Sequence, residues 1–262
     1  MNSRERSDTP FSVASYEVDF TGQMSLFSLF NRFQDLAGIH AAYLHVGYAQ
    51  LLELKLAWIL SRIRIQIHFL PRWGDTVELS TWPKGINRLF AMRDFSLTSE
   101  RGKILVLATS AWLLMDIEKN RPQRIEILPV DLKYPGAPHA IEEIPDKILV
   151  PEGLSTLFER QVWPSDMDTN RHVNNAQYAK WISDCFLEDQ FHNRRITSIQ
   201  INYLEETLSG DSVVLMKSPE DDLASECFIG GISRKKGSMV FSAHVAWDTM
   251  DTTGADRSNF FI

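Results

Sequence analysis

The same order of predicted elements occurs twice along the chain, and this repeat constrains the fold more than any other feature. An alternating segment is followed by a helix with one apolar face and then by several short strands. After a proline-rich interval the same series returns. Self-similarity of this kind predicts duplication of one strand–helix–strands unit.

In the first copy, apolar residues recur at spacings of three and four between Ser25 and about Leu44. This spacing predicts a helix with one buried face. Residues 62–69 alternate strictly between apolar and polar side chains, which is typical of a half-buried strand. The other strands predicted in this copy cover residues 11–20, 76–82, 89–97 and 104–115.

In the second copy, the predicted helix covers residues 175–190. Its apolar stripe consists of Tyr178, Trp181, Ile182, Cys185 and Phe186. The predicted strands cover residues 157–163, 197–204, 212–217, 227–233 and 238–247.

Short matches support the duplication. Gly74-Asp75 corresponds to Gly210-Asp211 at an offset of 136 residues (211 − 75), and Ser110-Ala111 corresponds to Ser242-Ala243 at an offset of 132 (242 − 110). Between the copies, six prolines interrupt residues 118–153, which indicates an ordered linker that crosses the surface. We therefore expect an N-terminal domain over residues 10–117 and a C-terminal domain over residues 154–250.

The two copies differ just before their helices. In the second copy, Asp168, Asn170 and His172 stand two residues apart on the approach to the helix. A helix start offers unpaired N–H groups and a partial positive charge, so this cluster could hold a polarised carbonyl beside acid/base groups. The alternative is a loop with helix-capping side chains. The first copy has residues 19–24 there instead, so its Leu- and Phe-rich helix is free to line an apolar pocket.

Composition narrows the class of protein. The net charge of −7 argues against a general nucleic-acid binder, and 44% hydrophobic residues is ordinary for a globular protein. Cys185 and Cys227 form neither a CxxC pair nor a disulfide framework. The N-terminus is polar, and the most apolar segment, residues 51–60, contains Glu53 and Lys55. We therefore expect a cytoplasmic protein without membrane insertion.

The stretch from Asp168 to Tyr178 reads D-x-N-x-H-V-N-N-x-x-Y and resembles the signature of the acyl-acyl carrier protein thioesterases of plants and bacteria. The resemblance covers roughly residues 10–248. It implies an α+β fold of two tandem hotdog domains, each a long helix wrapped by an antiparallel sheet. It also implies a catalytic glutamate at Glu206, which follows Tyr203 by three residues, although the neighbouring Glu205 is an alternative. Thr207 stands where many plant members carry a cysteine, so a Cys–His mechanism is not available there.

The resemblance implies hydrolysis of fatty acyl-acyl carrier protein thioesters, as in fatty acid biosynthesis. Asp168 would serve as nucleophile or base, Asn170 and His172 would orient groups and stabilise charge, and Glu206 would activate water. Backbone N–H groups near residues 173–175 would stabilise the oxyanion. This chemistry needs neither a metal nor a cofactor, and the expected partner is the acyl carrier protein.

Three other functions fit the same resemblance. They are hydrolysis of acyl-CoA, dehydration of a hydroxyacyl thioester by a hotdog dehydratase, and non-catalytic acyl binding. The acyl chain length depends on how side chains such as Leu26, Phe30 or Trp58 close the pocket, and homodimer formation is left open.

Overall fold

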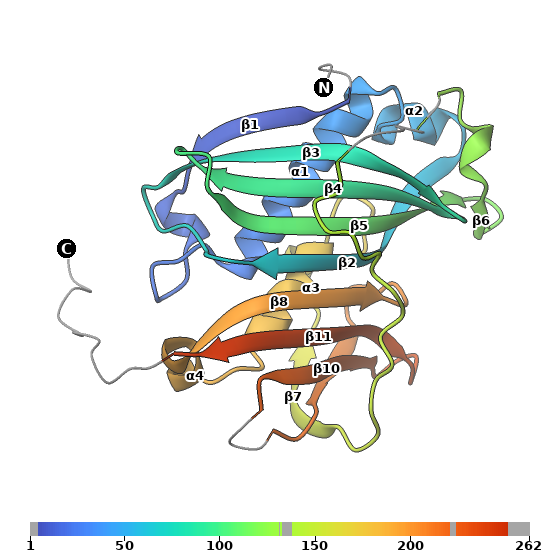
Figure 1. Cartoon of the computed structure of the whole chain (residues 1–262). Helices are drawn as coiled ribbons and strands as arrows, with labels where there is room; N and C mark the ends of the chain where they lie inside the picture. Colours follow the sequence, from blue (N-terminus) through green and yellow to red (C-terminus); the bar gives the residue numbers. More distant parts are fainter. Residues whose placement is uncertain (1–4, 131, 133–137, 221–223, 251–262) are drawn as a thin grey trace.

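The computed structural model describes residues 5–130, 132, 138–220 and 224–250. Within this part of the chain, one antiparallel sheet of eleven strands curls around the helices (Figure 1). The strands are β1 (Ser7–Ser12), β2 (Leu56–Ile67), β3 (Thr76–Asn87), β4 (Phe90–Ser99), β5 (Ile104–Asp116), β6 (Arg121–Gln123), β7 (Ser155–Gln161), β8 (Arg194–Tyr203), β9 (Ser212–Lys217), β10 (Glu226–Ser233) and β11 (Met239–Thr249). The expected α+β class is confirmed.

The sheet consists of two units whose strand orders mirror each other. The order runs β1-β3-β4-β5-β2 in the first unit and continues β8-β11-β10-β9-β7 in the second, while β6 extends from β5. The units meet where β2 pairs with β8 in antiparallel register, with Ile63 opposite Ile201 and Ile65 opposite Ile199. All four of these isoleucines are buried, so the junction belongs to one continuous core.

Each unit contains one principal helix behind the sheet, and the two helices contact each other. Helix α1 (Leu26–Tyr43) begins at Ser25, whose hydroxyl accepts from the N–H of Ser28 at 3.2 Å. Helix α3 (Asn175–Ser183) begins at Asn174, whose Oδ1 accepts from the N–H of Ala176 at 2.9 Å. Such N-caps satisfy donors that the first turn leaves unpaired. The buried face of α1 contains the expected stripe, including Leu29, Phe30 and Phe33.

Short helices complete the described part of the chain. These are α2 (Tyr48–Glu53), α4 (Glu188–Asn193) and the 3-10 turns η1 (Ser15–Glu17), η2 (Ile125–Ile127) and η3 (Pro164–Asp166). No helix among the described residues has the length and apolar character that crossing a membrane requires.

Hydrogen bonding confirms the Gly-Asp match between the copies. The N–H of Val13 donates to the carbonyl of Asp75 at 2.9 Å, and that of Val162 donates to Asp211 at the same distance. The Ser-Ala match is wrong. Ile67 pairs with Val106 and Tyr203 pairs with Phe241, so the equivalent offset on β5 and β11 is 135 residues (241 − 106) rather than 132.

Several predicted elements have the wrong extent. Strand β2 begins at Leu56 rather than at residue 62, and β3 continues to Asn87 rather than ending at residue 82. The strand expected over residues 11–20 ends at Ser12, because the chain then turns through η1. The helix expected over residues 175–190 ends at Ser183. There the N–H groups of Cys185 and Phe186 donate three residues back, to Ile182 and Ser183, and α4 starts separately after Leu187. The apolar stripe continues through this break, which is why periodicity alone missed it.

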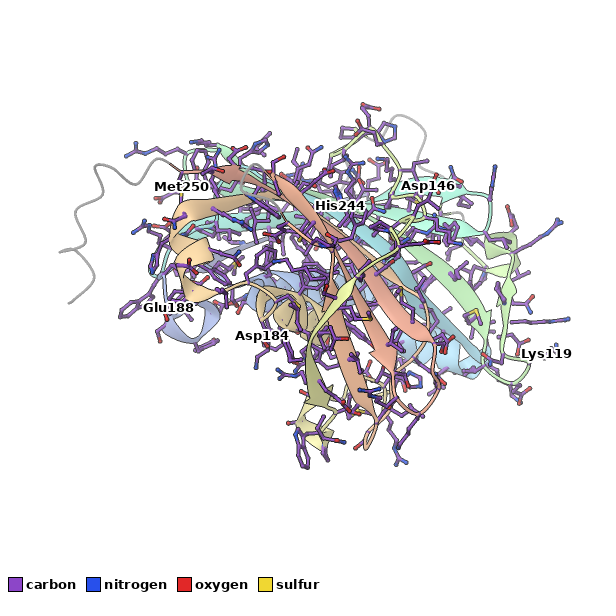
Figure 2. The ribbon with its side chains drawn as sticks, turned by 90° about the horizontal axis from the view of Figure 1, so that it is seen from below. Lys119, Asp146, Asp184, Glu188, His244 and Met250 are labelled. Carbon is purple, nitrogen blue, oxygen red and sulfur yellow. The ribbon has the colours of Figure 1, made fainter. Side chains whose placement is uncertain are left out.

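Part of the expected linker lies across the outer face of the sheet. The indole of Trp82 donates to the carbonyl of Pro138 at 2.8 Å, and the amides of Gln200 and Asn202 donate to the carbonyl of Asp146 at 2.6 and 3.2 Å. Figure 2 shows Asp146 beside His244 on this face. The segment therefore bonds to strands of both units. Residues 131 and 133–137 of the expected linker lie outside the described residues.

Candidate active site

The loop before α3 has a tightly hydrogen-bonded backbone. The N–H of Asp168 donates to the carbonyl of His172 at 2.8 Å, and the N–H of Arg171 donates back to Asp168 at 3.1 Å. Met167 and Val173 form an isolated antiparallel bridge that closes the loop. Arg171 takes a left-handed conformation with φ of 62°, which is uncommon for a residue other than glycine. The loop thus presents its side chains from a defined backbone.

The carboxylate of Asp168 is turned partly into this loop. Its Oδ1 accepts from the N–H groups of Asn170 at 2.8 Å and His172 at 3.2 Å. Its Oδ2 lies 3.5 Å from Nδ2 of Asn170. Asp168 therefore stabilises the backbone of its own loop rather than the first turn of α3, and Oδ2 is the oxygen with the weaker contact.

The structure brings His172 and Glu206 together from distant parts of the chain. Nε2 of His172 lies 2.9 Å from Oε2 of Glu206, and the two side chains are 37% and 55% exposed. An acid/base pair needs this hydrogen-bond distance and access to substrate. Of the two adjacent glutamates, Glu205 points elsewhere, with Oε2 3.6 Å from Nζ of Lys236. The contact with His172 thus belongs to Glu206.

The expected oxyanion donors are mostly occupied. The N–H of Val173 donates to the carbonyl of Thr207 at 3.0 Å, and the N–H of Asn174 donates to Asp166 at 2.9 Å. Asn175 is the first residue of α3, where an N–H group has no acceptor within the helix. The expectation that donors come from residues 173–175 therefore narrows to Asn175.

The cysteines are placed as core residues. Both Cys185 and Cys227 are buried, and burial raises the pKa of each thiol to about 12. A thiol with this pKa stays protonated near neutral pH and is a poor nucleophile. Within the described residues, no group of three or more His, Cys, Asp or Glu side chains is gathered as a metal site requires.

Residues expected to shape an acyl pocket lie in the cores. Leu26 and Phe30 are buried in the main core, and Phe33 of the same stripe stacks on Phe95 with ring centroids 4.7 Å apart. Trp58 packs against a second apolar cluster and donates from its indole to Val46 at 3.0 Å. Their role in acyl binding stays a prediction.

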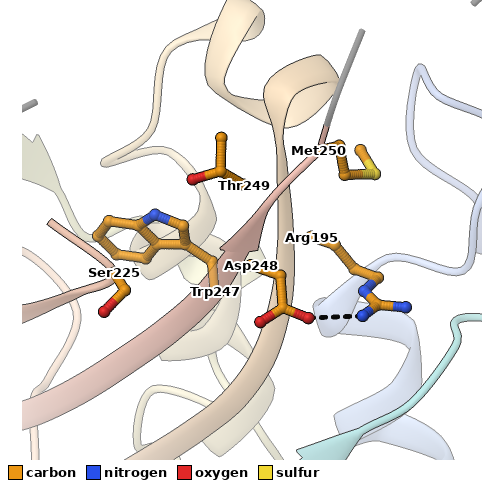
Figure 3. Close-up of a pocket in the computed structure, with 6 residues that line it drawn as sticks. All are labelled: Arg195, Ser225, Trp247, Asp248, Thr249 and Met250. Carbon is orange, nitrogen blue, oxygen red and sulfur yellow. Dashed lines mark hydrogen bonds and ion pairs between the residues drawn. The ribbon is translucent and has the colours of Figure 1, made fainter. Parts of the chain in front are cut away.

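Figure 3 shows a surface hollow in the second unit. It is lined by Arg195, Ser225, Trp247, Asp248, Thr249 and Met250, and Arg195 pairs with Asp248 at 2.5 Å. The hollow is at the end of β11, whereas the N–H of Glu205 bonds to Val240 near its start. Seven residues of strand separate these positions by roughly 20 Å, so the hollow is no part of the candidate site.

Sequence reasoning missed three contacts around the pair. Nζ of Lys236 donates to the carbonyl of Glu206 at 2.7 Å. Tyr178 was assigned to the apolar stripe, and its hydroxyl donates to Oγ1 of Thr207 at 2.9 Å. The hydroxyl of Tyr203 donates to the carbonyl of Asn175 at 3.1 Å. A tyrosine in an apolar stripe is the one available signal, because a buried hydroxyl needs a partner.

Two units of this topology, each with a central helix against an antiparallel sheet, define a double hotdog protein. The pair formed by His172 and Glu206 lies in the second unit. Residues 5–128 match the family model "Acyl-ACP thioesterase N-terminal domain", and residues 154–249 match "Acyl-ACP thioesterase C-terminal domain". The chain belongs to the acyl-ACP thioesterase family.

Solved structures support the same fold. An acyl-ACP thioesterase from Bacteroides thetaiotaomicron is 26% identical with a TM-score of 0.81, and the match covers 93% of this chain and 98% of that one. The 12:0-ACP thioesterase from Umbellularia californica is 22% identical with a TM-score of 0.75, covering 94% and 98%, and shows the fold alone.

Among curated relatives, a chloroplastic acyl-[acyl-carrier-protein] hydrolase from Cuphea viscosissima is 26% identical over 211 residues. That match covers 75% of this chain and 50% of the relative, so this chain spans about half the length of the relative. An oleoyl-acyl carrier protein thioesterase from Arabidopsis thaliana is 28% identical, with coverage of 80% and 62%.

Proposed function

We propose that this protein hydrolyses fatty acyl thioesters carried on an acyl carrier protein, releasing a free fatty acid and the carrier thiol. The observation that carries the proposal is the 2.9 Å contact between Nε2 of His172 and Oε2 of Glu206, formed beside the loop that leads into α3. The names of the matched relatives and of the family support the substrate class.

The geometry favours direct attack by water. Asp168 has one carboxylate oxygen held by two backbone N–H groups, whereas Glu206 is more than half exposed. Glu206 takes a proton from water, and the water oxygen bonds to the carbonyl carbon. The N–H of Asn175 stabilises the resulting oxyanion, and loss of one such donor typically costs about 3–4 kcal/mol. The alternative is an acyl-enzyme formed through Oδ2 of Asp168.

Collapse of the tetrahedral intermediate breaks the carbon–sulfur bond. His172 gives its proton to the departing sulfur, so the carrier leaves as a thiol. The proton held by Glu206 then passes to His172 across their hydrogen bond, which restores both groups. Asn170 lies against Asp168 and orients that carboxylate. The proton cycle is thus closed by Glu206 and His172 alone.

The remaining expectations belong to the same proposal. Residues 10–117 form the N-terminal domain that binds the acyl chain, residues 118–153 connect the domains, and residues 154–250 carry Asp168, Asn170, His172 and Glu206. The acyl carrier protein is the macromolecular partner. A cytoplasmic location and formation of a homodimer stay predictions.

The test measures thiol release from matched panels of acyl-carrier-protein and acyl-CoA thioesters of several chain lengths. Wild type is compared with His172→Ala and Glu206→Ala, and circular dichroism checks that the variants are folded. We expect release by wild type from the carrier substrates and loss of most turnover in both variants. Release from acyl-CoA alone would replace the carrier assignment. No release from any thioester would favour a dehydratase or an acyl-binding protein.

A further inference from the structure

Two tyrosine hydroxyls connect the start of α3 with the segment that carries Glu206, and they do so in opposite directions. Tyr178, on the helix, donates to Oγ1 of Thr207 at 2.9 Å. Tyr203, at the end of β8, donates to the carbonyl of Asn175 at 3.1 Å. The acceptor Thr207 follows Glu206 directly, and Tyr203 precedes Glu206 by three residues. These two hydrogen bonds, here called the tyrosine bridges, therefore flank Glu206 on both sides along the chain.

The Tyr178–Thr207 bridge is shielded from water, whereas the Tyr203–Asn175 bridge is part-buried. Thr207 has no exposed surface, and Tyr178 is 3% exposed. The two tyrosine rings meet edge to face, with centroids 5.4 Å apart. Burial raises the pKa of Tyr178 to about 12, so its hydroxyl remains a donor at neutral pH. Hydrogen bonds in such surroundings resist exchange with water and hold their partners in a fixed geometry.

The first unit shows that the fold does not require these hydroxyls. By the equivalence of the two units, Leu29 replaces Tyr178, Pro71 replaces Thr207 and Ile67 replaces Tyr203. The backbone connection at this place is nevertheless the same. The N–H of Met24 donates to the carbonyl of Pro71 at 2.8 Å, as that of Val173 donates to Thr207 at 3.0 Å. The tyrosine bridges are present only where the candidate catalytic groups are present.

We propose that Tyr178, Thr207 and Tyr203 are positioning residues that keep Glu206 within hydrogen-bond distance of His172. This inference rests on the proposed function. The Glu206 side chain is exposed and follows the end of a strand, so the position of its backbone segment decides whether the carboxylate can reach His172. Displacement by about 1 Å can cost on the order of 10²-fold in rate, so such support has a measurable effect.

The experiment compares the wild-type chain with Thr207→Val, Thr207→Ser, Tyr178→Phe and Tyr203→Phe. Steady-state kinetics are measured across pH on the best thioester of the panel. Thr207→Val and Tyr178→Phe should lower kcat about 10-fold or more with little change in KM. Tyr203→Phe should do so to a smaller extent, and Thr207→Ser should retain activity. Tyr43→Phe, an exposed tyrosine at the end of α1, is the matched control and should behave as wild type.

A second measurement does not depend on turnover. The ring-nitrogen NMR signal of His172 reports its hydrogen bond to Glu206, and we expect it to change in Thr207→Val toward that of Glu206→Gln. If Thr207→Val fails to fold because a buried tyrosine hydroxyl has lost its acceptor, Tyr178→Phe combined with Thr207→Val removes both partners and avoids that cost. This double variant resembles the first unit and should fold.

The outcomes separate the two proposals. If wild type hydrolyses thioesters but the folded bridge variants keep their kcat, their pH profile and the His172 signal of wild type, the positioning role is wrong. If wild type hydrolyses no thioester, the proposed function fails, and the NMR comparison then decides whether the bridges hold the His172–Glu206 contact.

Discussion

The loops before α1 and α3 have the same backbone and different side chains. Asp19 N–H donates to the carbonyl of Gln23 at 2.8 Å, as Asp168 N–H donates to His172 at 2.8 Å. In each loop one residue has a positive φ, 74° at Gly22 and 62° at Arg171. The loop conformation is therefore a property of the duplicated unit, and it does not by itself indicate chemistry.

The chemical difference comes from two positions. Gln23 stands where the second unit has His172, and Leu70 stands where it has Glu206. An amide has no accessible protonation step, and Leu70 packs against the core. Asp19 is retained, and its Oδ1 accepts from the N–H of Thr21 at 2.8 Å. The comparison teaches that the aspartate has a structural role in both units, whereas the histidine and glutamate distinguish the second.

The largest effect is expected from giving the second unit the side chains of the first. His172→Gln combined with Glu206→Leu should lower kcat on the order of 10³-fold, because positioned acid/base groups typically contribute 10²–10⁴-fold. The two single variants should each cost nearly as much, since groups that act together are non-additive. Thiol-release kinetics on acyl-carrier-protein thioesters measure this. A fully active double variant would place the chemistry elsewhere.

Asp168→Asn should have the next largest effect, and Asp19→Asn is its matched control. Asparagine retains an oxygen that can accept from the loop N–H groups, so both variants should keep the free energy of unfolding of wild type within about 1 kcal/mol. On the alternative acyl-enzyme path only Asp168→Asn should lose turnover, by about 100-fold or more, because Oδ2 of Asp168 is then the nucleophile. Equal activity in the two variants would leave Asp168 as a loop cap alone.

The two units also differ in the contacts of one buried carboxylate, and this difference affects the stability of the fold in acid. Glu17 accepts from the N–H of Ala14 at 2.9 Å and from Arg32 at 2.7 and 3.0 Å, whereas its counterpart Asp166 accepts from the N–H of Trp163 at 2.8 Å. Burial raises the pKa of Glu17, but the hydrogen bonds from Arg32 and Ala14 outweigh it and hold the pKa below the ordinary 4.5. A lowered pKa in the folded state stabilises the fold above the unfolded pKa, and this stabilisation is lost as pH falls through the folded value.

Glu17→Gln should therefore lower the free energy of unfolding by about 2 kcal/mol at neutral pH, the usual range for hydrogen bonds to a charged group. The difference from wild type should shrink as pH falls below 4.5 and through the lowered pKa of folded Glu17. Urea unfolding at neutral pH and below pH 4.5 measures the difference in free energy of unfolding between Glu17→Gln and wild type. A difference that grows in acid would contradict the assignment.

The smallest expected effect concerns the left-handed residue of each loop. Gly22→Arg should cost about 1–2 kcal/mol, since a side chain there adopts φ of 74° although the space around it is open. Arg171→Gly should be neutral or stabilising by up to about 1 kcal/mol for the same reason. Thermal unfolding of both variants gives the comparison. A strongly destabilised Arg171→Gly would show that the arginine side chain has a structural role.

Local patterns were sufficient to predict much of this fold. Helix starts at Ser25 and Asn174 follow from capping residues placed before apolar stripes, and Gly74 and Gly210 occupy equivalent turns. The break after Ser183 was not predictable from periodicity, because Cys185 and Phe186 continue the apolar stripe beyond it. The register of β11 relative to β5 was mispredicted because a dipeptide match is too short to fix it.

The candidate site was predictable in part. Asp168, Asn170 and His172 lie within five residues, so the sequence alone places them on one loop. The contact between His172 and Glu206, which are 34 residues apart (206 − 172), was inferred from a family resemblance and not from local physics. The bond from Tyr178 to Thr207 depends on how α3 packs beside the end of β8, which no local pattern specifies.

The segment that crosses the outer face of the sheet joins what could otherwise be two separate molecules. Because both units belong to one chain, their association is unimolecular and does not weaken on dilution, unlike a dimer governed by mass action. In a dimer of identical chains, any substitution in one loop would appear in both. Joining the units removes that symmetry, so one unit can carry the histidine and the glutamate while the other carries Gln23 and Leu70 in their places.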